Sequence, residues 1–362
     1  MAPVLVRRPD WLQGHGLVAR LRWLAGQRER LTETIDGAIA AAPRDPLRWR
    51  QRIFILKQGE MLDQALATVA RARSFVGHDL GLAFDEATLL TESGQLDAAD
   101  RAFAALPPID DASVAVHRAR HALRRGEVHR VEAIVQSTLA GPSAHLVTPY
   151  LSIAWRLLGD PRWQALEGDP ALISVIDLPG EFAPLAALLR QLHARSGQPL
   201  EQSVRGGTQT DGPLLSRIEP EIVALRRQLI EAVERHVAQL PRSQVGHPQL
   251  GRRPSRKVRF AGSWSIRLAG QGYHTAHVHP EGWFSSAFYV AVPSAAEMGE
   301  SPNGWLQLGQ PPADLASGLQ PQRLVEPRPG RLVLFPSTMW HGTLPIDSGE
   351  RLTVAFDIAA RG

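Results

Sequence analysis

The sequence predicts an α+β chain of two parts. The first, residues 1–178, is an array of helical hairpins, and the second, residues 179–362, is a jelly-roll domain, or double-stranded β-helix. Two patterns predict this fold class. Glycines recur about every 34 residues through a helix-forming first half, and short stretches with period-two alternation of apolar residues fill the last third. A length of 362 residues is sufficient for two domains.

The helical half shows an internal repeat. Residues 14–160 are rich in Ala, Leu and Arg, and their turn glycines are separated by 35, 32 and 33 residues: Gly59, Gly94, Gly126 and Gly159. A helix-turn-helix unit of about 34 residues is the tetratricopeptide period. The segment GQLDAADRAFAALPP resembles the second half of such a repeat, in which the small Ala99 lets two helices approach and Phe103 fills the groove between them. An ordinary helical bundle with chance spacing is the alternative.

The character of the chain changes near residue 160. We expect a short apolar strand from Ile173 to Leu178 and two helices that support the second domain, at residues 179–197 and 220–240. Between them, residues 202–213 (QSVRGGTQTDGP) are predicted to form an ordered polar loop. Its polar side chains are candidates for a lid over a site, and the alternative is an ordered interdomain connection: Arg205, Gln209 and Thr210.

The last third predicts a barrel or sandwich of short strands. Apolar residues alternate from Val258 onward, and Gly, Pro and Asn separate the stretches, as is typical of jelly rolls. The strand candidates are residues 258–268, 275–278, 285–292, 305–308, 331–335 and 352–358.

Three histidines occupy positions suited to binding a metal ion. His277 and His279 are two residues apart, so on a strand their side chains share one face. His341 lies 62 residues beyond His279, at the end of another predicted strand. Two close ligands and one distant ligand suit the facial arrangement of non-haem iron(II) sites, which leaves coordination positions open.

Arg351 is a candidate for binding a carboxylate near this site. It follows His341 by ten residues, and the intervening DSGE indicates a tight turn. Antiparallel pairing about Ile346 would place His341 and Arg351 opposite each other, and a guanidinium there could hold a carboxylate through two hydrogen bonds. The alternative is that Arg351 pairs with Glu350 or Asp347.

Several segments together resemble a known enzyme family. HVHPEGWFSSAFYVAVP, GWLQLGQPP, PRPGRLVLFPSTMWHGTLP and ERLTVAFDI resemble the 2-oxoglutarate/iron(II) oxygenases found fused to tetratricopeptide repeats in bacteria, and EQSVRGGTQT and GSWSIRL fit the same family. The resemblance covers about residues 200–358. The core also resembles prolyl hydroxylases, in which a tyrosine placed like Tyr273 precedes the first ligand, and the layout is similar to that of aspartyl/asparaginyl β-hydroxylases.

The resemblance implies an enzyme that uses iron(II), 2-oxoglutarate and dioxygen to hydroxylate a peptide or protein side chain held partly by the helical array. It implies metal ligands at His277, His279 and His341 and a 2-oxoglutarate contact at Arg351. Further candidates for cosubstrate contacts, each of which has a structural alternative as core or barrel filler, are Tyr289, Ser286 and Thr353. Trp283 is a candidate for the substrate side of the site, or else for the core.

One position departs from the usual His-x-Asp/Glu…His pattern, because His279 stands where a carboxylate is expected. Either three neutral imidazoles bind the metal, or His279 only supports the site and two protein ligands remain. His274 is a possible substitute ligand, but its odd offset from His277 predicts that it points across the strand.

Composition excludes other classes of function. The chain has no cysteine, which excludes disulfides, zinc fingers and thiol catalysis. The net charge is +4 without a basic run, so we expect no nucleic-acid partner. No apolar run approaches the roughly 20 residues of a membrane span, and no signal peptide is evident, so we expect a cytoplasmic protein. An oxygenase for a small metabolite and a non-catalytic interaction protein remain alternatives.

Overall fold

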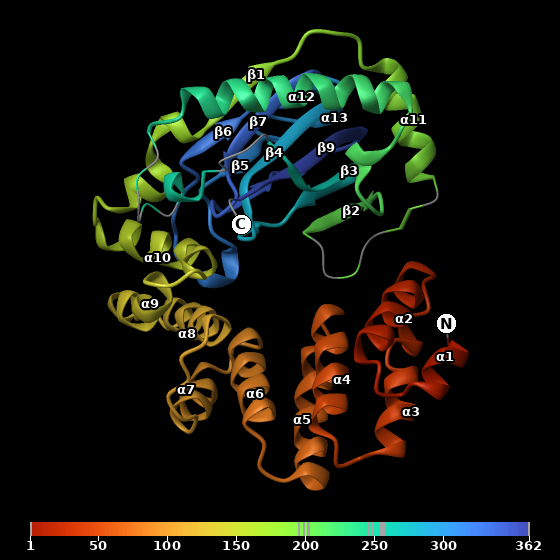
Figure 1. Ribbon diagram of the computed structural model, residues 1–362, viewed down its shortest axis with the longest axis vertical. Helices are drawn as coiled ribbons and strands as arrows, with labels where there is room; N and C mark the ends of the chain where they lie inside the picture. The colour runs from red at the N-terminus through yellow and green to blue at the C-terminus, as the bar shows by residue number, and fades with distance from the viewer. Residues whose placement is uncertain are drawn as a thin grey trace. The chain divides into compact units, whose positions relative to one another are not determined.

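The computed structural model describes residues 2–194, 196–197, 200, 203–242, 244, 247, 249–253 and 258–360. The chain forms two compact units, Met1–Asp110 with Pro199–Gln202, and Asp111–Gln198 with Ser203–Gly362. The predicted fold class is confirmed, since an all-helical region precedes a domain built on antiparallel sheets (Figure 1). The units differ in their bounds from the sequence domains 1–178 and 179–362, which stay a prediction.

The first unit consists of helices that pack with their neighbours in sequence. Helix α4 contacts α5, and α6 contacts α7. The turns between partners are only a few residues long, so the two helices of each pair run antiparallel. The helices are α1 (Ala2–Arg7), α2 (Leu12–Leu24), α3 (Glu33–Ala41), α4 (Pro46–Gln58), α5 (Leu62–Val76), α6 (Leu80–Glu92) and α7 (Leu96–Ala104).

The repeat is visible in the caps as well as in the turns. The carboxylates of Asp45, Asp79 and Asp111 accept backbone N–H groups in the first turns of α4, α6 and α8 (Ala112–Arg124). Such caps satisfy N–H groups that the helix leaves without partners. The predicted turn glycines follow α4, α6, α8 and α10 (Ala144–Leu158), and three of them adopt positive φ: Gly94, Gly126 and Gly159.

The second unit begins with α8, α9 (Val131–Leu139) and α10, and these helices pack against its sheet domain. The indole Nε1 of Trp340 donates to the carbonyl oxygen of Pro149 in α10 at 3.1 Å. The Tyr150 ring meets the Trp340 ring edge to face, with centroids 5.7 Å apart. The Arg156 guanidinium donates to the carbonyl of Gln320 at 2.9 Å. The middle of α10 is therefore attached to Trp340, which immediately precedes His341, and the end of α10 is attached to Gln320.

A six-stranded antiparallel sheet forms the centre of this unit, in the order β1-β7-β4-β9-β3-β2. Helices α11 (Ala183–His193) and α12 (Pro220–Gln239) pack on one face of it through an apolar cluster (Figure 1). These helices and strand β1 confirm the elements expected between residues 173 and 240. The strands are β1 (Ser174–Asp177), β2 (Val204–Gln209), β3 (Phe260–His274), β4 (Gly282–Ala291), β7 (Arg331–Pro336) and β9 (Glu350–Ala359).

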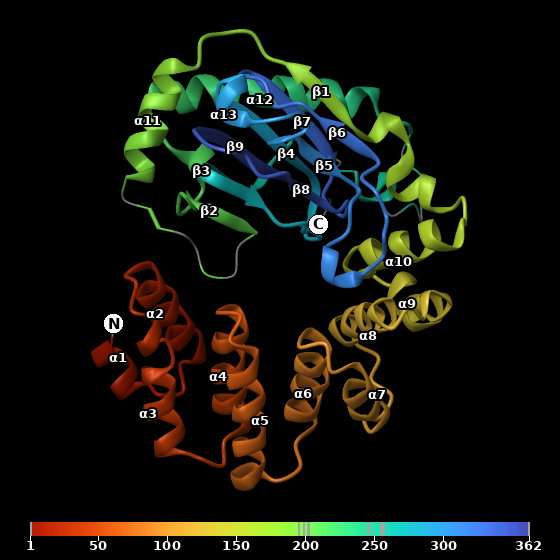
Figure 2. The ribbon, with the colours of Figure 1, turned by 180° about the vertical axis from the view of Figure 1, so that it is seen from behind.

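A smaller sheet of three strands has the order β6-β5-β8 (Figure 2). Its strands are β5 (Leu306–Leu308), β6 (Arg323–Val325) and β8 (His341–Thr343). Side chains of both sheets form a second apolar cluster, which includes Tyr289 and Val333 of the large sheet and Leu306 and Val325 of the small one. Two sheets with a shared interior are the arrangement expected of a jelly roll.

The predicted polar loop at 202–213 is wrong over half of its length. Residues 204–209 form the edge strand β2, paired with β3 across a bulge between Arg205 and Gly207. The sequence did not predict this strand because glycine has a low propensity for strands. The close pairing of β2 with β3 nevertheless requires both glycines. A Cβ on Gly207 would lie 2.5 Å from the carbonyl oxygen of Arg267, and Gly206 has φ +66°.

Two further predictions, for residues 275–278 and for the hairpin about Ile346, are wrong. Residues 275–278 do not form a strand, and His277 instead makes an isolated bridge with His341. The expected hairpin about Ile346 is also absent from the described residues. Strand β8 pairs with β5, whereas Arg351 on β9 lies opposite Leu268 of β3. The turn directs the chain from one sheet to the other, and the side of β8 that does not pair with β5 bridges to His277 instead of to β9.

Among the described residues, no helix combines the length and the apolar character needed to cross a lipid bilayer.

The close approach of β2 and β3 predicts that Gly207→Ala destabilises the second unit. The added methyl group meets backbone rather than a flexible side chain, so we expect a loss of about 1–3 kcal/mol in the free energy of unfolding. Chemical denaturation followed by tryptophan fluorescence measures it. Gly141→Ala is the matched control, because its nearest neighbour would lie at 3.6 Å, and it should change stability little. Equal effects of the two substitutions would contradict the tight β2–β3 pairing.

Candidate metal centre

Side chains of β9 alternate between its two faces, and every second one faces a pocket between the sheets. Successive side chains of a strand point to opposite faces. The residues of β9 that face the pocket are Arg351, Thr353, Ala355 and Asp357. Those between them belong to the core under α11 and α12: Leu352, Val354, Phe356 and Ile358. The walls of the pocket also include Trp264 and Ile266 of β3 and Tyr289 of β4.

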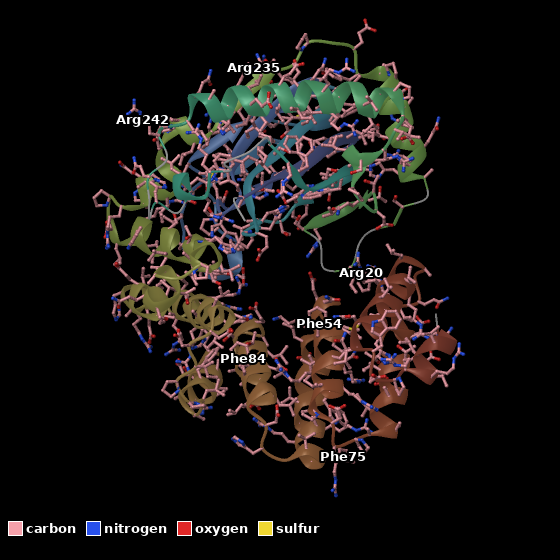
Figure 3. All side chains as sticks on the ribbon, in the orientation of Figure 1. Arg20, Phe54, Phe75, Phe84, Arg235 and Arg242 are labelled. Atoms are coloured by element: carbon pink, nitrogen blue, oxygen red, sulfur yellow. The ribbon has the colours of Figure 1, made fainter. Side chains whose placement is uncertain are left out.

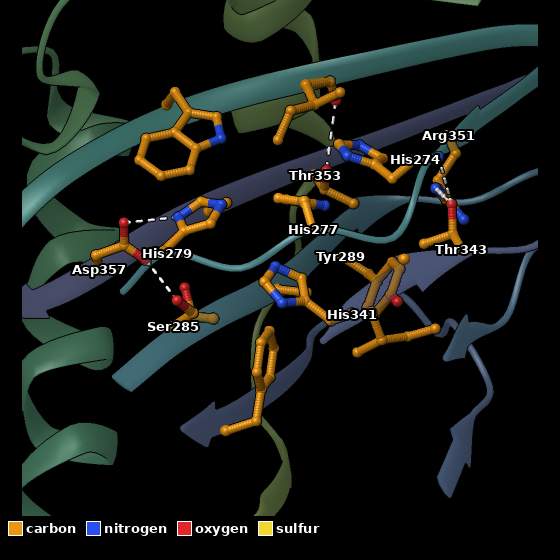
Figure 4. A pocket seen from close by; sticks show the side chains of 18 residues that line it. His274, His277, His279, Ser285, Tyr289, His341, Thr343, Arg351, Thr353 and Asp357 are labelled. Atoms are coloured by element: carbon orange, nitrogen blue, oxygen red, sulfur yellow. Dashed lines mark hydrogen bonds and ion pairs between the residues drawn. The ribbon is translucent and has the colours of Figure 1, made fainter. Parts of the chain in front are cut away.

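The three predicted histidines meet in this pocket (Figure 4). Each offers a ring nitrogen, and these atoms all lie within 4.8 Å of one another. The backbone brings them together: His277 and His341 exchange two N–H···O bonds of 2.9 and 3.0 Å, and the N–H of His279 donates to Ser337 at 2.9 Å. The ring centroid of His277 lies 5.0 Å from that of His279 and 4.2 Å from that of His341.

Each of the three rings has its Nδ1 engaged outside the cluster. His277 Nδ1 lies 2.8 Å from the carbonyl oxygen of Thr275, and His341 Nδ1 lies 2.9 Å from that of Met339. A carbonyl can only accept, so Nδ1 must carry the proton in both rings. The proton-free Nε2 atoms of His277 and His341 can then act as ligands, with the Ser203 hydroxyl 3.3 Å from His277 Nε2, and the acceptor on the far side holds each ring in place.

Burial keeps these imidazoles neutral. It lowers the pKa of His277 to about 3, with a smaller contribution from the neighbouring His279. Burial also lowers the pKa of His341 well below its ordinary value, and His277 adds to the effect. Neutral imidazole is the form that binds a metal ion, so at neutral pH the site needs to release no proton from these two rings.

His279 differs from the other two because its Nδ1 partner is a carboxylate. Asp357 Oδ2 lies 2.8 Å from His279 Nδ1, and Asp357 Oδ1 accepts from the Ser285 hydroxyl at 2.6 Å. Sequence reasoning missed both Asp357 and Ser285. The signal was present, because Asp357 is six residues beyond Arg351 on a strand, and an even offset places both on one face.

Arg351 is buried at the other end of the pocket and has only neutral partners among the described residues (Figure 4). Its Nη1 donates to the carbonyl of Gly304 at 2.6 Å, and its Nη2 donates to the Thr343 hydroxyl at 2.8 Å. Its Nε has no partner. Burial lowers the pKa of Arg351, yet a guanidinium stays protonated in proteins. A buried cation with a free N–H calls for an anionic ligand.

The alternative partners proposed for Arg351 are engaged elsewhere. Glu350 points to the other side of β9, where it binds Arg190 and Arg267. Asp347 accepts from the Asn303 amide at 2.9 Å. The described carboxylates nearest in sequence therefore leave the Arg351 charge uncompensated.

The three predicted cosubstrate contacts all line the pocket. Tyr289 is the most informative, because its buried hydroxyl has no partner and burial raises the pKa of the phenol, which keeps its proton available for donation. The Ser286 hydroxyl instead donates to the carbonyl of Phe356 at 2.9 Å. Thr353 Oγ1 lies 3.5 Å from the carbonyl oxygen of Ile266. Their roles in binding stay predictions.

The predicted lid and substrate residues do not line this pocket. Thr210 is buried and continues the edge pairing, since its Oγ1 accepts from the N–H of Ser265 at 2.9 Å. Arg205 and Gln209 belong to β2. Trp283 is fully buried in the core below the sheet, and its Nε1 donates to the carbonyl of Gln249 at 2.8 Å. A substrate role for these four residues stays a prediction without support from the pocket.

His274 does line the pocket, so the expectation that it points across the strand is wrong. The chain leaves β3 after His274, and the strand alternation no longer relates it to His277. Its ring stacks on that of His277, with centroids 5.9 Å apart, and its Nδ1 lies 3.1 Å from the Ser203 hydroxyl. It is not one of the three converging ligands.

Comparison with known proteins agrees with the chemistry of this pocket. Residues 262–357 match the family described as "Putative 2OG-Fe(II) oxygenase". The C-terminal part of the chain is therefore similar to this family. The matched range contains the three histidines, Arg351 and Asp357. No curated protein matches the chain.

Solved structures similar to this chain include several hydroxylases. A Pseudomonas putida prolyl-4-hydroxylase shares 21% identity, with 57% of this chain and 100% of that chain covered and a TM-score of 0.36. The viral collagen prolyl hydroxylase of Paramecium Bursaria Chlorella virus-1 shares 15%, with 53% and 98% covered and a TM-score of 0.36. HygX from Streptomyces hygroscopicus, with nickel, 2-oxoglutarate and hygromycin B bound, shares 15%, with 54% and 84% covered and a TM-score of 0.37.

Three converging imidazoles predict a graded loss of metal binding. His341→Ala should abolish binding of Mn²⁺ or Co²⁺, because it removes the most buried of the three converging imidazoles. His279→Ala should weaken binding by about 10-fold or more, since a third ligand is lost. Isothermal titration calorimetry measures both. Wild-type affinity in His279→Ala would favour the alternative of two protein ligands.

Proposed function

We propose that this protein is an iron(II)- and 2-oxoglutarate-dependent oxygenase that hydroxylates a C–H bond of its substrate. The observation that carries the proposal is the combination, within one pocket, of three converging imidazoles and a buried guanidinium without a counter-ion. Both features lie in the stretch that matches the oxygenase family.

The residues present fit the two cofactors. Imidazole nitrogens are suitable ligands for iron(II), and three of them leave coordination positions for other groups. Arg351 Nε and the Tyr289 hydroxyl are two buried donors that lack acceptors, and a carboxylate of 2-oxoglutarate would supply the missing acceptors. His277, His279 and His341 would hold the metal, and Arg351 with Tyr289 would hold the far carboxylate of the cosubstrate.

When bound, iron(II) and 2-oxoglutarate let dioxygen oxidise a C–H bond, so that substrate, 2-oxoglutarate and O₂ yield hydroxylated substrate, succinate and CO₂. The chain contributes position and environment. Three histidine ligands would leave coordination positions for other groups, Arg351 would set the direction of the cosubstrate, and an apolar wall that includes Ile266, Leu306 and Phe335 would limit the access of water.

We further propose that the substrate is a peptide or protein side chain and that the N-terminal helix pairs are tetratricopeptide-like repeats that help to bind it. The recurring Asp caps and turn glycines support a repeat, and stacked repeats form extended surfaces suited to a chain. Phe54 and Phe75 of α4 and α5 are 47% and 44% exposed and offer apolar contacts (Figure 3). A cytoplasmic setting is part of this proposal.

The cosubstrate role of Arg351 predicts a selective kinetic defect. Wild-type protein loaded with iron(II) should convert 2-oxoglutarate to succinate, at least in slow uncoupled turnover. Arg351→Ala should raise the 2-oxoglutarate concentration needed for half-maximal rate by at least about 30-fold, since loss of one member of a buried charge pair costs roughly 2–5 kcal/mol.

Arg267→Ala is the matched control for this measurement. Arg267 pairs with Glu350 on the outer side of the same sheet, so its loss should leave the 2-oxoglutarate requirement within about threefold. A similarly small change in Arg351→Ala would refute its assigned role. Absence of succinate from the iron-loaded wild type, with and without a peptide library, would refute the enzyme itself.

Substrate binding by the helix pairs predicts that Phe54→Asp affects peptide turnover alone. With a peptide substrate from a library screen, the KM should rise severalfold, because an exposed apolar contact is replaced by a charge. The rate of uncoupled succinate formation should not change. Ile218→Asp, at a residue that is 88% exposed in the second unit, is the control. If Phe54→Asp and Ile218→Asp both leave KM unchanged, Phe54 has no part in substrate binding.

A further inference from the structure

The three histidines of the pocket are not held alike. His277 and His341 direct Nδ1 to a backbone carbonyl two residues earlier in their own segments. His279 directs Nδ1 to the Asp357 carboxylate, which lies 78 residues away on β9. One of the three candidate ligands is therefore oriented by an ionisable side chain, and this is the ligand that stands where a carboxylate is usual in the pattern.

The Asp357 carboxylate is itself held in place. Ser285 is its cross-strand neighbour on β4, and an ionised carboxylate can only accept, so the Ser285 proton goes to Asp357 Oδ1. The Ser337 hydroxyl lies 2.9 Å from the Ser285 oxygen. On the far side of the imidazole, the Trp264 ring stacks on His279 with centroids 5.4 Å apart. His279 is thus confined by an aromatic face and a fixed acceptor.

We propose that Asp357 is a positioning residue of the metal centre, which supplies through His279 the negative charge that the usual carboxylate ligand would provide. The inference rests on the proposed function. A carboxylate that accepts from Nδ1–H fixes the tautomer in which Nε2 carries no proton. It also makes Nε2 a stronger electron-pair donor to a metal ion. Three neutral imidazoles alone would leave iron(II) without any protein charge, and Asp357 adds one negative charge a single side chain away.

The same geometry has a consequence for engineering of the site. An aspartate at position 279 would place its carboxylate oxygens one bond beyond Cγ, where His279 now has Nδ1. Those oxygens would then lie close to Asp357 Oδ2, and two carboxylates at such a distance repel. His279→Asp should therefore not recreate a functional two-histidine, one-carboxylate site while Asp357 remains charged.

Metal affinity tests the proposal without reliance on turnover. The probes are Mn²⁺ by titration calorimetry and Co²⁺ by its visible absorption, with the full chain. Asp357→Ala should weaken binding about 10- to 100-fold, the usual effect of losing such a partner, and should change the Co²⁺ spectrum. Glu350→Ala, which removes a carboxylate from the opposite face of the same strand, should stay within about threefold of wild type.

A double substitution separates positioning from mere folding. His279→Asp should bind metal at least tenfold more weakly than His279→Asp combined with Asp357→Asn, because the asparagine removes the repulsion and its amide can donate to the new carboxylate. A residue that only stabilises the fold would make the double variant worse than the single one. Thermal unfolding of each metal-free variant shows whether it is folded.

The outcomes distinguish failure of this inference from failure of the proposed function. If wild-type protein binds neither metal, both are overturned. If wild type binds and Asp357→Ala binds equally well, or His279→Asp alone binds better than the double variant, only the role of Asp357 is overturned. If Asp357→Ala loses binding while His279→Ala keeps it, Asp357 is a direct ligand and the positioning role is overturned.

Discussion

Strand β9 carries the constraint on which the rest of the domain depends. It lies between β3 and β4, so both its edges are hydrogen bonded and both its faces are covered. One face supplies the pocket, and the other packs under the helices. A slip of one residue would exchange the two faces, which would bury Asp357 and Arg351 in the apolar core. The register that satisfies the core therefore also places the polar groups of the site.

The histidines combine local and long-range orientation. Two rings are held by carbonyl groups of their own segments, two residues earlier in the chain. The third depends on β9 and hence on the whole six-stranded sheet. Burial keeps the rings of His277 and His341 neutral, because a charged imidazole would lose its hydration there.

Charge is distributed unevenly along the pocket. Arg351 stands at one end and Asp357 at the other, with the histidines between them (Figure 4). Since both project from the same face of one strand, their separation is set by the strand itself. Arg351 would attract one carboxylate of an elongated anionic ligand. Asp357, at the opposite end of the pocket, would repel that carboxylate. The strand thus gives the pocket a direction as well as a shape.

The fold class and the three histidines could be predicted from the sequence, because strand alternation, helix periodicity and residue chemistry are local properties. Arg351 was also predicted, although the hairpin expected to place it is absent from the described residues. The helix pairs could also be predicted, through turn glycines that need positive φ. Features that depend on pairing between distant segments could not be predicted in this way. The glycine-rich β2 became a strand only because β3 offered an edge, and β8 and β9 separated into different sheets despite a turn between them. Asp357 contacts His279 only because of the register of β9. Spacing within one segment does not predict which strand will lie beside another.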